Sequence, residues 1–196
     1  LGDPLRFIGA NLARSGTLSA RFMNERLGVD NALALVPGAT PGELHAQLPD
    51  ATDPGAIADW AVGTYGVAIR VEEPGQPVWS SNRVPVVIAP RISAAPRSAT
   101  AGLPFTLSVD CMPRLHPQQQ AGARLLFGET ELVPASISTP ADTSLPTAIA
   151  FEVPAHDPGS YLLRLRVDGI DSLPVHFAGS PPVLSFDPEQ SVELVE

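Results

Sequence analysis

Two residue types that most proteins use freely are almost or wholly missing from this chain of 196 residues, which has one cysteine and no lysine. Cys111 therefore has no partner for a disulfide within the chain, and its apolar surroundings predict a buried thiol rather than a nucleophile. Small exported domains often carry a disulfide, so its absence favours folding in a reducing cytoplasm. The 12 basic residues are all arginine and lie scattered among 21 acidic residues. A biased genome composition explains them better than anion recognition does.

Other absences exclude several classes of function. Aromatic residues make up only 6% of the chain, and no apolar run approaches the length of a membrane-spanning helix. The net charge of −9 argues against nucleic acid or an anionic membrane as the partner. No phosphate-binding glycine loop, nucleophile elbow or helical histidine pair is present. We expect no enzyme activity, no metal and no cofactor, since the four histidines are dispersed: His45, His116, His156 and His176.

The only two tyrosines, Tyr65 and Tyr161, occupy the same position in two similar strings. Each follows a glycine by two residues and begins an alternating apolar segment that ends in Arg-Val. A tyrosine at the start of such a strand is typical of the tyrosine corner of immunoglobulin-like sandwiches, where the hydroxyl bonds back to the backbone. Its occurrence twice predicts an all-β chain of two tandem immunoglobulin-like β-sandwiches.

Alternation with a period of two supports strands with one buried face. Apolar residues alternate after both tyrosines and again before Pro154, and the 22 prolines fall between short apolar runs, as expected at strand ends and turns. Asp168-Gly169 predicts a tight hairpin turn. The alternative, that Asp168 and Asp171 begin a calcium site, lacks most of the oxygen ligands that calcium needs.

We place the first module at residues 1–88 and the second at residues 89–196. Residues 89–96 contain Pro90 and Pro96, and we expect them to form an extended linker that doubles as the first strand of the second module. The first module has no equivalent leading strand before Gly2, so either that strand lies upstream or the module lacks it. Because the chain opens at Leu1 rather than Met, we expect it to be a trimmed or cleaved piece of a longer protein.

Two segments, residues 28–41 and 50–62, look like insertions that only the first module carries. The second includes Ile57 and Trp60 in a short helical pattern. Loops that differ between matched modules often carry function, so we predict that Ile57, Trp60 and Trp79 contact a protein partner and that the insertions are dispensable for the fold. The alternative is that each tryptophan plugs the end of a sandwich.

Several strings together resemble a known family. Residues 90–96, 126–131 and 151–155 look like the immunoglobulin-like fold of plexins and transcription factors. Residues 81–92 and 159–172, with Phe186-Asp187-Pro188, resemble the C-terminal half of the cap, or tail-terminator, proteins of phage-tail-like contractile injection systems. The resemblance to the immunoglobulin-like fold covers nearly the whole chain, but its motifs are strands and turns rather than catalytic signatures.

The resemblance implies a bacterial structural protein that acts through protein–protein contacts. Its partners would be sheath, tube or other cap subunits, with a homo-oligomer in the assembly, formed in the cytoplasm before any release with the particle. The rival class is a ligand- or carbohydrate-binding accessory module of a bacterial surface or secreted protein. A signal peptide, disulfides and exposed aromatic residues would favour that rival.

Overall fold

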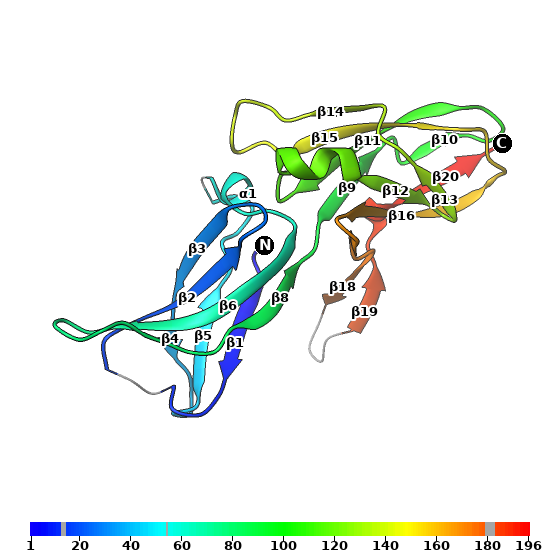
Figure 1. The fold of residues 1–196 in the computed structure, drawn as a ribbon. Helices are drawn as coiled ribbons and strands as arrows, with labels where there is room; N and C mark the ends of the chain where they lie inside the picture. The colour runs from blue at the N-terminus through cyan, green and yellow to red at the C-terminus, as the bar shows by residue number, and fades with distance from the viewer. Residues whose placement is uncertain (13–14, 54, 179–182) are drawn as a thin grey trace.

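The computed structural model describes residues 1–12, 15–53, 55–178 and 183–196, and side chains 176–178 lie outside the description. The chain is all-β, built of immunoglobulin-like β-sandwiches (Figure 1). Every described strand ladder joins strands on the same side of residues 89–90. We refer to the part up to Ile88 as module one and to the part from residue 89 as module two.

Module one consists of two sheets with a shared core. One sheet has the order β1-β5-β4 and the other the order β3-β2-β6-β7, with β8 also paired to β6. The long strands alternate buried and exposed residues because each covers the core with one face. The elements are β1 (Pro4–Ile8), β2 (Thr17–Asn24), β3 (Val29–Ala34), β4 (Val36–Pro37), β5 (Glu43–Gln47), α1 (Ala56–Asp59), β6 (Gly63–Glu72), β7 (Trp79–Ser80) and β8 (Val84–Ile88).

Module two has the same plan with longer sheets. Its sheets have the orders β14-β15-β11-β9 and β10-β20-β16-β12-β13, with β17 paired to β16. The elements are β9 (Arg91–Ala95), β10 (Ser98–Thr100), β11 (Phe105–Met112), η1 (Pro117–Gly122), β12 (Arg124–Phe127), β13 (Thr130–Leu132), β14 (Ser136–Ser138), β15 (Thr147–Val153), β16 (Gly159–Val167), β17 (Ile170–Asp171), β18 (Val175–Ala178), β19 (Val183–Phe186), η2 (Pro188–Gln190) and β20 (Ser191–Val195).

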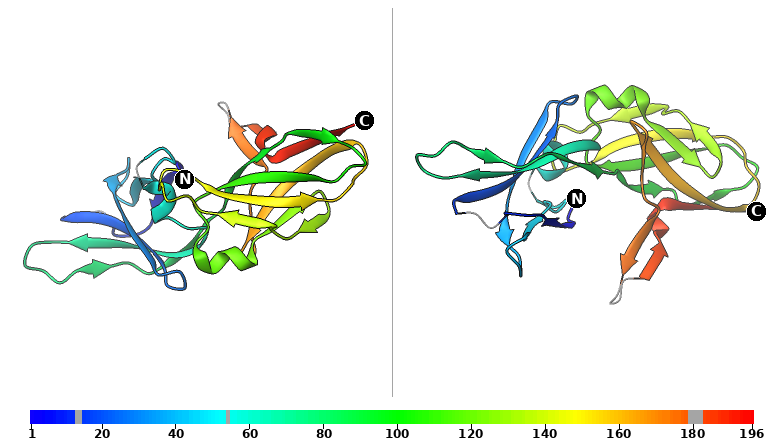
Figure 2. Two further views of the ribbon diagram at one scale, coloured as in Figure 1. Left: turned by 90° about the horizontal axis from the view of Figure 1, so that it is seen from above. Right: turned by 60° about the horizontal axis from the view of Figure 1, so that its bottom comes forward.

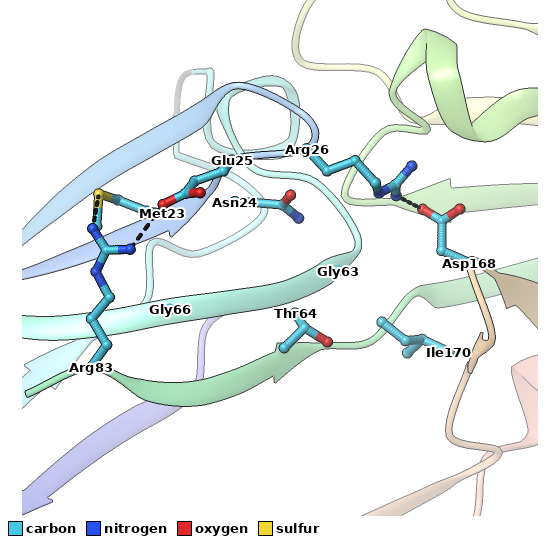
Figure 3. Close-up of a pocket in the computed structure, with 10 residues that line it drawn as sticks. All are labelled: Met23, Asn24, Glu25, Arg26, Gly63, Thr64, Gly66, Arg83, Asp168 and Ile170. Carbon is cyan, nitrogen blue, oxygen red and sulfur yellow. Dashed lines mark hydrogen bonds and ion pairs between the residues drawn. The ribbon is translucent and has the colours of Figure 1, made fainter.

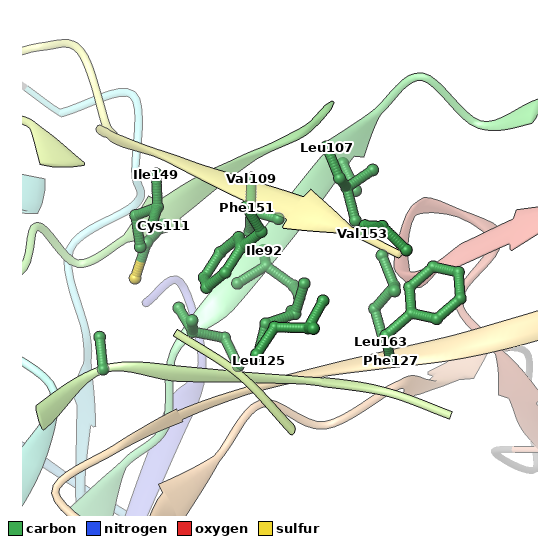
Figure 4. Packing of buried hydrophobic residues seen from close by; sticks show 14 of the residues in the cluster. Ile92, Leu107, Val109, Cys111, Leu125, Phe127, Ile149, Phe151, Val153 and Leu163 are labelled. Atoms are coloured by element: carbon green, nitrogen blue, oxygen red, sulfur yellow. The ribbon is translucent and has the colours of Figure 1, made fainter. Parts of the chain in front are cut away.

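The core of module two lies between its two sheets (Figure 4). Leu107 and Val109 of β11 are fully buried there, and so is Leu163 of β16, as the alternation after Tyr161 predicted. Cys111 is also fully buried, with its thiol directed at the Pro113 carbonyl oxygen 3.4 Å away. Asp168 and Gly169 both have positive φ, at 52° and 79°, and they join β16 to β17 in the predicted tight turn.

The prediction that residues 28–41 are an insertion is wrong. They do not form an extra loop on module one, because β3 pairs with β2 and β4 pairs with β5. Strands β13 and β14 occupy the matching places in module two, where they pair with β12 and β15. The segment is therefore part of the common plan. The connection that carries α1, at residues 48–62, is longer than its counterpart at residues 154–158.

The prediction for residues 89–96 agrees with the structure, since β9 follows β8 after two residues and pairs with β11. Figure 1 shows the chain passing directly from one module into the other at this point. A separate antiparallel hairpin, β18–β19, leaves the sandwich of module two and projects to one side in each view (Figures 1 and 2). None of the helical turns in the described part of the chain has the length and apolar character of a membrane span.

Candidate protein-contact surfaces

Each tyrosine predicted at a corner bonds to the backbone four residues upstream. The Tyr65 hydroxyl donates to the Ala61 carbonyl oxygen at 2.8 Å and accepts from the Ala61 N–H at 3.0 Å. The Tyr161 hydroxyl donates to the Asp157 carbonyl oxygen at 2.9 Å. Tyr65 is fully buried, and burial raises its pKa, whereas Tyr161 is only half-buried. The two corners are equivalent in geometry and unequal in environment.

Ile57 and Trp60 lie inside the molecule, with 1% and 5% of their surface exposed. The Trp60 ring packs edge-on against Phe22, with centroids 5.2 Å apart, and tilts against Tyr65 at 5.8 Å. Trp60 therefore plugs one end of module one, which is the alternative that the sequence left open. Neither side chain offers a separate partner a surface, and their burial argues against the prediction that the segment is dispensable for the fold.

The α1 segment contacts module two of the same chain. The Arg114 N–H donates to the Ile57 carbonyl oxygen at 2.8 Å, and Val62 is fully buried in the core of module two. The Gln119 side chain, also fully buried, donates through Nε2 to the Val62 carbonyl oxygen at 2.8 Å and to the Asp168 carboxylate. The segment thus joins the modules by apolar burial and by satisfied backbone groups.

A polar pocket of about 430 Å³ lies beside this junction (Figure 3). Its charged side chains are already paired: Arg26 with Asp168 across the junction, and Arg83 with Glu25 at 2.9 Å. Arg83 also approaches the Met23 sulfur at 3.8 Å. Of the ion pairs at this pocket, the one between Arg26 and Asp168 joins the two modules.

Trp79 occupies an intermediate position, partly buried at the edge of a second cavity. This groove of about 500 Å³ lies in module one and is lined mainly by apolar side chains of β1, β6 and β8. Val67 and Ile69 form its floor and are almost fully buried, while Trp79 and Val86 are partly exposed. Trp79 is thus the one predicted contact residue that reaches a solvent-accessible groove.

The hairpin β18–β19 carries the most exposed group of large apolar side chains on adjacent residues. Val183, Leu184 and Phe186 on β19 are 64%, 56% and 68% exposed, and Leu173 just before the hairpin is 63% exposed. The sequence analysis overlooked this segment. Its signal was available, because two short apolar runs flank residues 179–182, whose types are Gly, Ser, Pro and Pro.

Two groups that could carry chemistry, Cys111 and His156, lie in or against the core of module two. Burial, with a smaller contribution from Asp110, raises the pKa of the Cys111 thiol to about 12, so the thiolate is absent at neutral pH. His156 packs edge-on against Phe127 and Tyr161. Within the described residues, no three His, Cys, Asp or Glu side chains come together as a metal site.

A family model matches residues 85–194, most of the chain, under the description "Domain of unknown function (DUF8756)". The matched region begins in β8 and covers module two almost completely. A comparison with curated proteins gives no match.

The chain is also similar, at low sequence identity, to several solved structures. One is the Bacteroides ovatus mixed-linkage glucan utilization locus protein SGBP-B in complex with a mixed-linkage heptasaccharide, 17% identical, with 99% of this chain and 42% of that chain covered and a TM-score of 0.32. Another is the pair of Clostridium thermocellum CbhA fibronectin(III)-like modules, 11% identical, with coverages of 98% and 86% and a TM-score of 0.28. A third is an ICAM-5 D1–D4 ectodomain fragment, 14% identical, with coverages of 100% and 50% and a TM-score of 0.32. The chain spans half or less of the length of the first and third of these.

Proposed function

Because the chain belongs to the DUF8756 domain family, whose description assigns no activity, we propose from its surfaces that it is a structural protein that acts through protein–protein contacts. The proposal involves no catalytic step and no metal. The observation that carries it is the hairpin β18–β19, on which three large apolar side chains of β19 are more than half exposed.

The physical reason is the cost of leaving such a hairpin in water. Burying a Val, Leu or Phe side chain stabilises a contact by about 1.5–3 kcal/mol, and a two-stranded hairpin is marginally stable by itself. The hairpin pairs only within itself among the described strands. A partner that covers β19 would gain apolar burial and would stabilise the hairpin at the same time.

The finer form of the proposal is a place in the cap of a contractile injection system. It is supported by the sequence resemblance of residues 81–92 and 159–172. In that role the hairpin would contact sheath, tube or another cap subunit, as part of a homo-oligomer formed in the bacterial cytoplasm.

The test compares two double variants, each of which replaces two exposed apolar side chains with serine. Leu184→Ser with Phe186→Ser alters the hairpin, while Leu103→Ser with Val133→Ser alters side chains that are 59% and 65% exposed elsewhere on module two. Each tagged protein is used to recover partners from a native lysate, and these are identified by mass spectrometry. We expect sheath, tube or cap subunits with the wild type and the control, and their loss with the hairpin variant.

Equal recovery by both variants would exclude the hairpin as the contact. The rival function, carbohydrate binding, is tested on an oligosaccharide array. Strong binding to the array by a protein that recovers no protein partner would replace the assembly proposal, and Trp79 in its groove would then be the aromatic residue to substitute first.

A further inference from the structure

A short strand is held against the long central strand in the same way in both modules, β7 on β6 and β17 on β16. In module two, the Ser172 N–H donates to the Leu165 carbonyl oxygen at 2.8 Å, and the Ser172 Oγ accepts from the Leu165 N–H at 3.1 Å. In module one, Ser81 makes the same two bonds to Ile69, each at 2.9 Å. The two serines therefore occupy equivalent positions, and the residues before them can be compared directly.

The residue before this serine differs in its chemistry. In module two it is Asp171, which lies opposite Arg166 and accepts from its guanidinium at 2.6 and 3.0 Å. Arg164 lies 3.4 Å from the same carboxylate, and the two arginines lower the pKa of Asp171, with the Arg166 hydrogen bonds as the main cause. In module one the corresponding pair is Ser80 opposite Arg70. Module one therefore has a hydroxyl where module two has a carboxylate.

Ser80 borders a pocket of about 250 Å³ on the outer face of module one, which we call the Ser80 pocket. Three arginines line it: Arg21 of β2, Arg70 of β6, and Arg83, which precedes β8. Ala68 lies among them and leaves room, because its side chain is a single methyl group. None of the described residues that line this pocket is acidic. The fold thus gathers arginines that are scattered in the sequence.

Two of these arginines lie in one electrostatic environment. Arg21 donates to Asp30 through Nε at 2.7 Å and through a terminal nitrogen. This pairing lowers the pKa of Asp30, and the charge of Arg70 lowers it further, so Arg70 lies within electrostatic range of the pair. Arg70 itself approaches Glu72 through Nε at 3.3 Å. Among the contacts between described residues, both terminal nitrogens of Arg70 remain able to donate.

Arg83 reaches the Ser80 pocket across β6. Its Cδ lies 3.5 Å from the position that a Cβ on Gly66 would take, and its guanidinium bonds to Glu25 at 2.9 Å (Figure 3). Its other terminal nitrogen lies 3.8 Å from the Met23 sulfur, which is a weak acceptor. Carboxylates outside the pocket lining thus hold the three guanidinium groups, and they orient them for a further acceptor inside it.

We propose that the Ser80 pocket binds a carboxylate group of a ligand, which takes the place that Asp171 fills in module two. Arg70 supplies the main contact, and Arg21 supplies a second guanidinium from the neighbouring strand. A guanidinium can bind a carboxylate through two parallel hydrogen bonds, which favours this class of ligand. The pocket lies on module one, away from the hairpin β18–β19, so the inference stands whether or not the hairpin function is correct.

The carboxylate can come from a small molecule or from an acidic side chain of a polypeptide. Citrate and an acetylated, amidated Asp-Glu-Asp peptide are the two probes, each titrated into isotope-labelled protein at low salt and followed by NMR. We expect saturable shifts at the backbone amides of Ala68, Arg70 and Ser80, with binding that weakens as salt rises. Tighter binding of citrate assigns the pocket to a small molecule, and tighter binding of the peptide assigns it to an acidic polypeptide. Either order supports the site.

The sharpest test introduces the carboxylate of module two into module one. Ser80→Asp places an acidic side chain opposite Arg70, so it should occupy the pocket and weaken citrate binding about tenfold or more. It should also raise the midpoint of thermal unfolding at low salt. Ser80→Asn has nearly the same shape as the aspartate but no charge, and it should bind citrate almost as the wild type does.

A second pair of variants removes a guanidinium. Arg70→Gln should weaken citrate binding about tenfold or more, whereas Arg97→Gln, which removes an exposed arginine of module two, should leave it unchanged. This pair decides if Ser80→Asp fails to fold by circular dichroism. The proposal is wrong if neither probe saturates, if the wild-type shifts lie away from the pocket, or if the two members of either pair bind citrate equally.

Discussion

Tyr65 is the residue on which the corner of module one depends most. Its hydroxyl satisfies both the N–H and the carbonyl of Ala61, which is itself buried. Tyr65→Phe leaves both groups unpaired and should lower the free energy of unfolding by about 1–3 kcal/mol. Tyr161→Phe should cost only about 1 kcal/mol, because Tyr161 makes one bond and lies nearer to water. Urea unfolding of the two variants measures the difference, and equal losses would contradict the unequal environments.

Cys111 provides a pH-dependent test at the same scale. Its pKa is raised from 9.0 to about 12 in the folded state, so the neutral thiol stabilises the fold fully below pH 9. That contribution is lost as the pH rises from 9 towards 12, because the unfolded chain then loses the proton first. Thermal unfolding should show a decline in stability above pH 9.

The matched variant for this test is Cys111→Ala, which lacks the ionisable group. It should be less stable at neutral pH because of the cavity, but its stability should fall less steeply between pH 9 and 11. A thiol reagent should react with the wild type only after denaturant is added. Fast labelling of the folded protein at pH 7.5 would show that the thiol is accessible.

At the scale of elements, the α1 segment is structural. Trp60→Ala removes a buried ring that contacts Phe22 and Tyr65, and it should lower the free energy of unfolding by about 3–5 kcal/mol. Trp79→Ala, at a partly exposed position, should cost clearly less. Chemical denaturation followed by circular dichroism checks both. If Trp79→Ala lowers the free energy of unfolding as much as Trp60→Ala does, the special role of Trp60 in closing the end of module one is wrong.

The sequence predicted the strands that alternate cleanly and missed those that do not. The inward residues after each tyrosine are recognisable because β6 and β16 bury one face over their whole length. Strand β3 combines Asp30 and Asn31 with apolar residues, so its local pattern indicates a loop rather than a strand. Its identity comes from pairing with β2, which is a long-range contact that no local pattern encodes.

The contact surfaces were harder to predict than the strands for a similar reason. Trp60 and Trp79 are the same residue type in short local patterns, yet one is buried by Phe22, which is distant in sequence, and the other borders a groove. The groove itself arises from the lack of a neighbour beside β1 among the described strands. No local pattern in the sequence shows that Leu5 and Phe7 are only half-buried beside it.

At the scale of the whole molecule, Gln119 connects the two modules. Gln119→Leu keeps the volume but leaves the buried Val62 carbonyl without its side-chain donor and Asp168 with Arg26 alone, so we expect a loss of about 1–3 kcal/mol. Faster hydrogen exchange in residues 56–63 should accompany it. Arg26→Ala, which breaks a partly exposed ion pair, is the control and should cost less than about 1 kcal/mol. If Arg26→Ala lowers the free energy of unfolding more than Gln119→Leu does, the ion pair between Arg26 and Asp168 is the stronger link between the modules.

The passage from β8 into β9 through Ala89 and Pro90 has a mechanical consequence. A connection of two residues, together with Val62 anchored in the neighbouring core, leaves little freedom for twisting or bending between the modules. Torque applied to one end is transmitted to the other rather than absorbed by a hinge. The chain should behave as a stiff spacer of fixed length, which holds whatever its two ends bind at a set distance and angle.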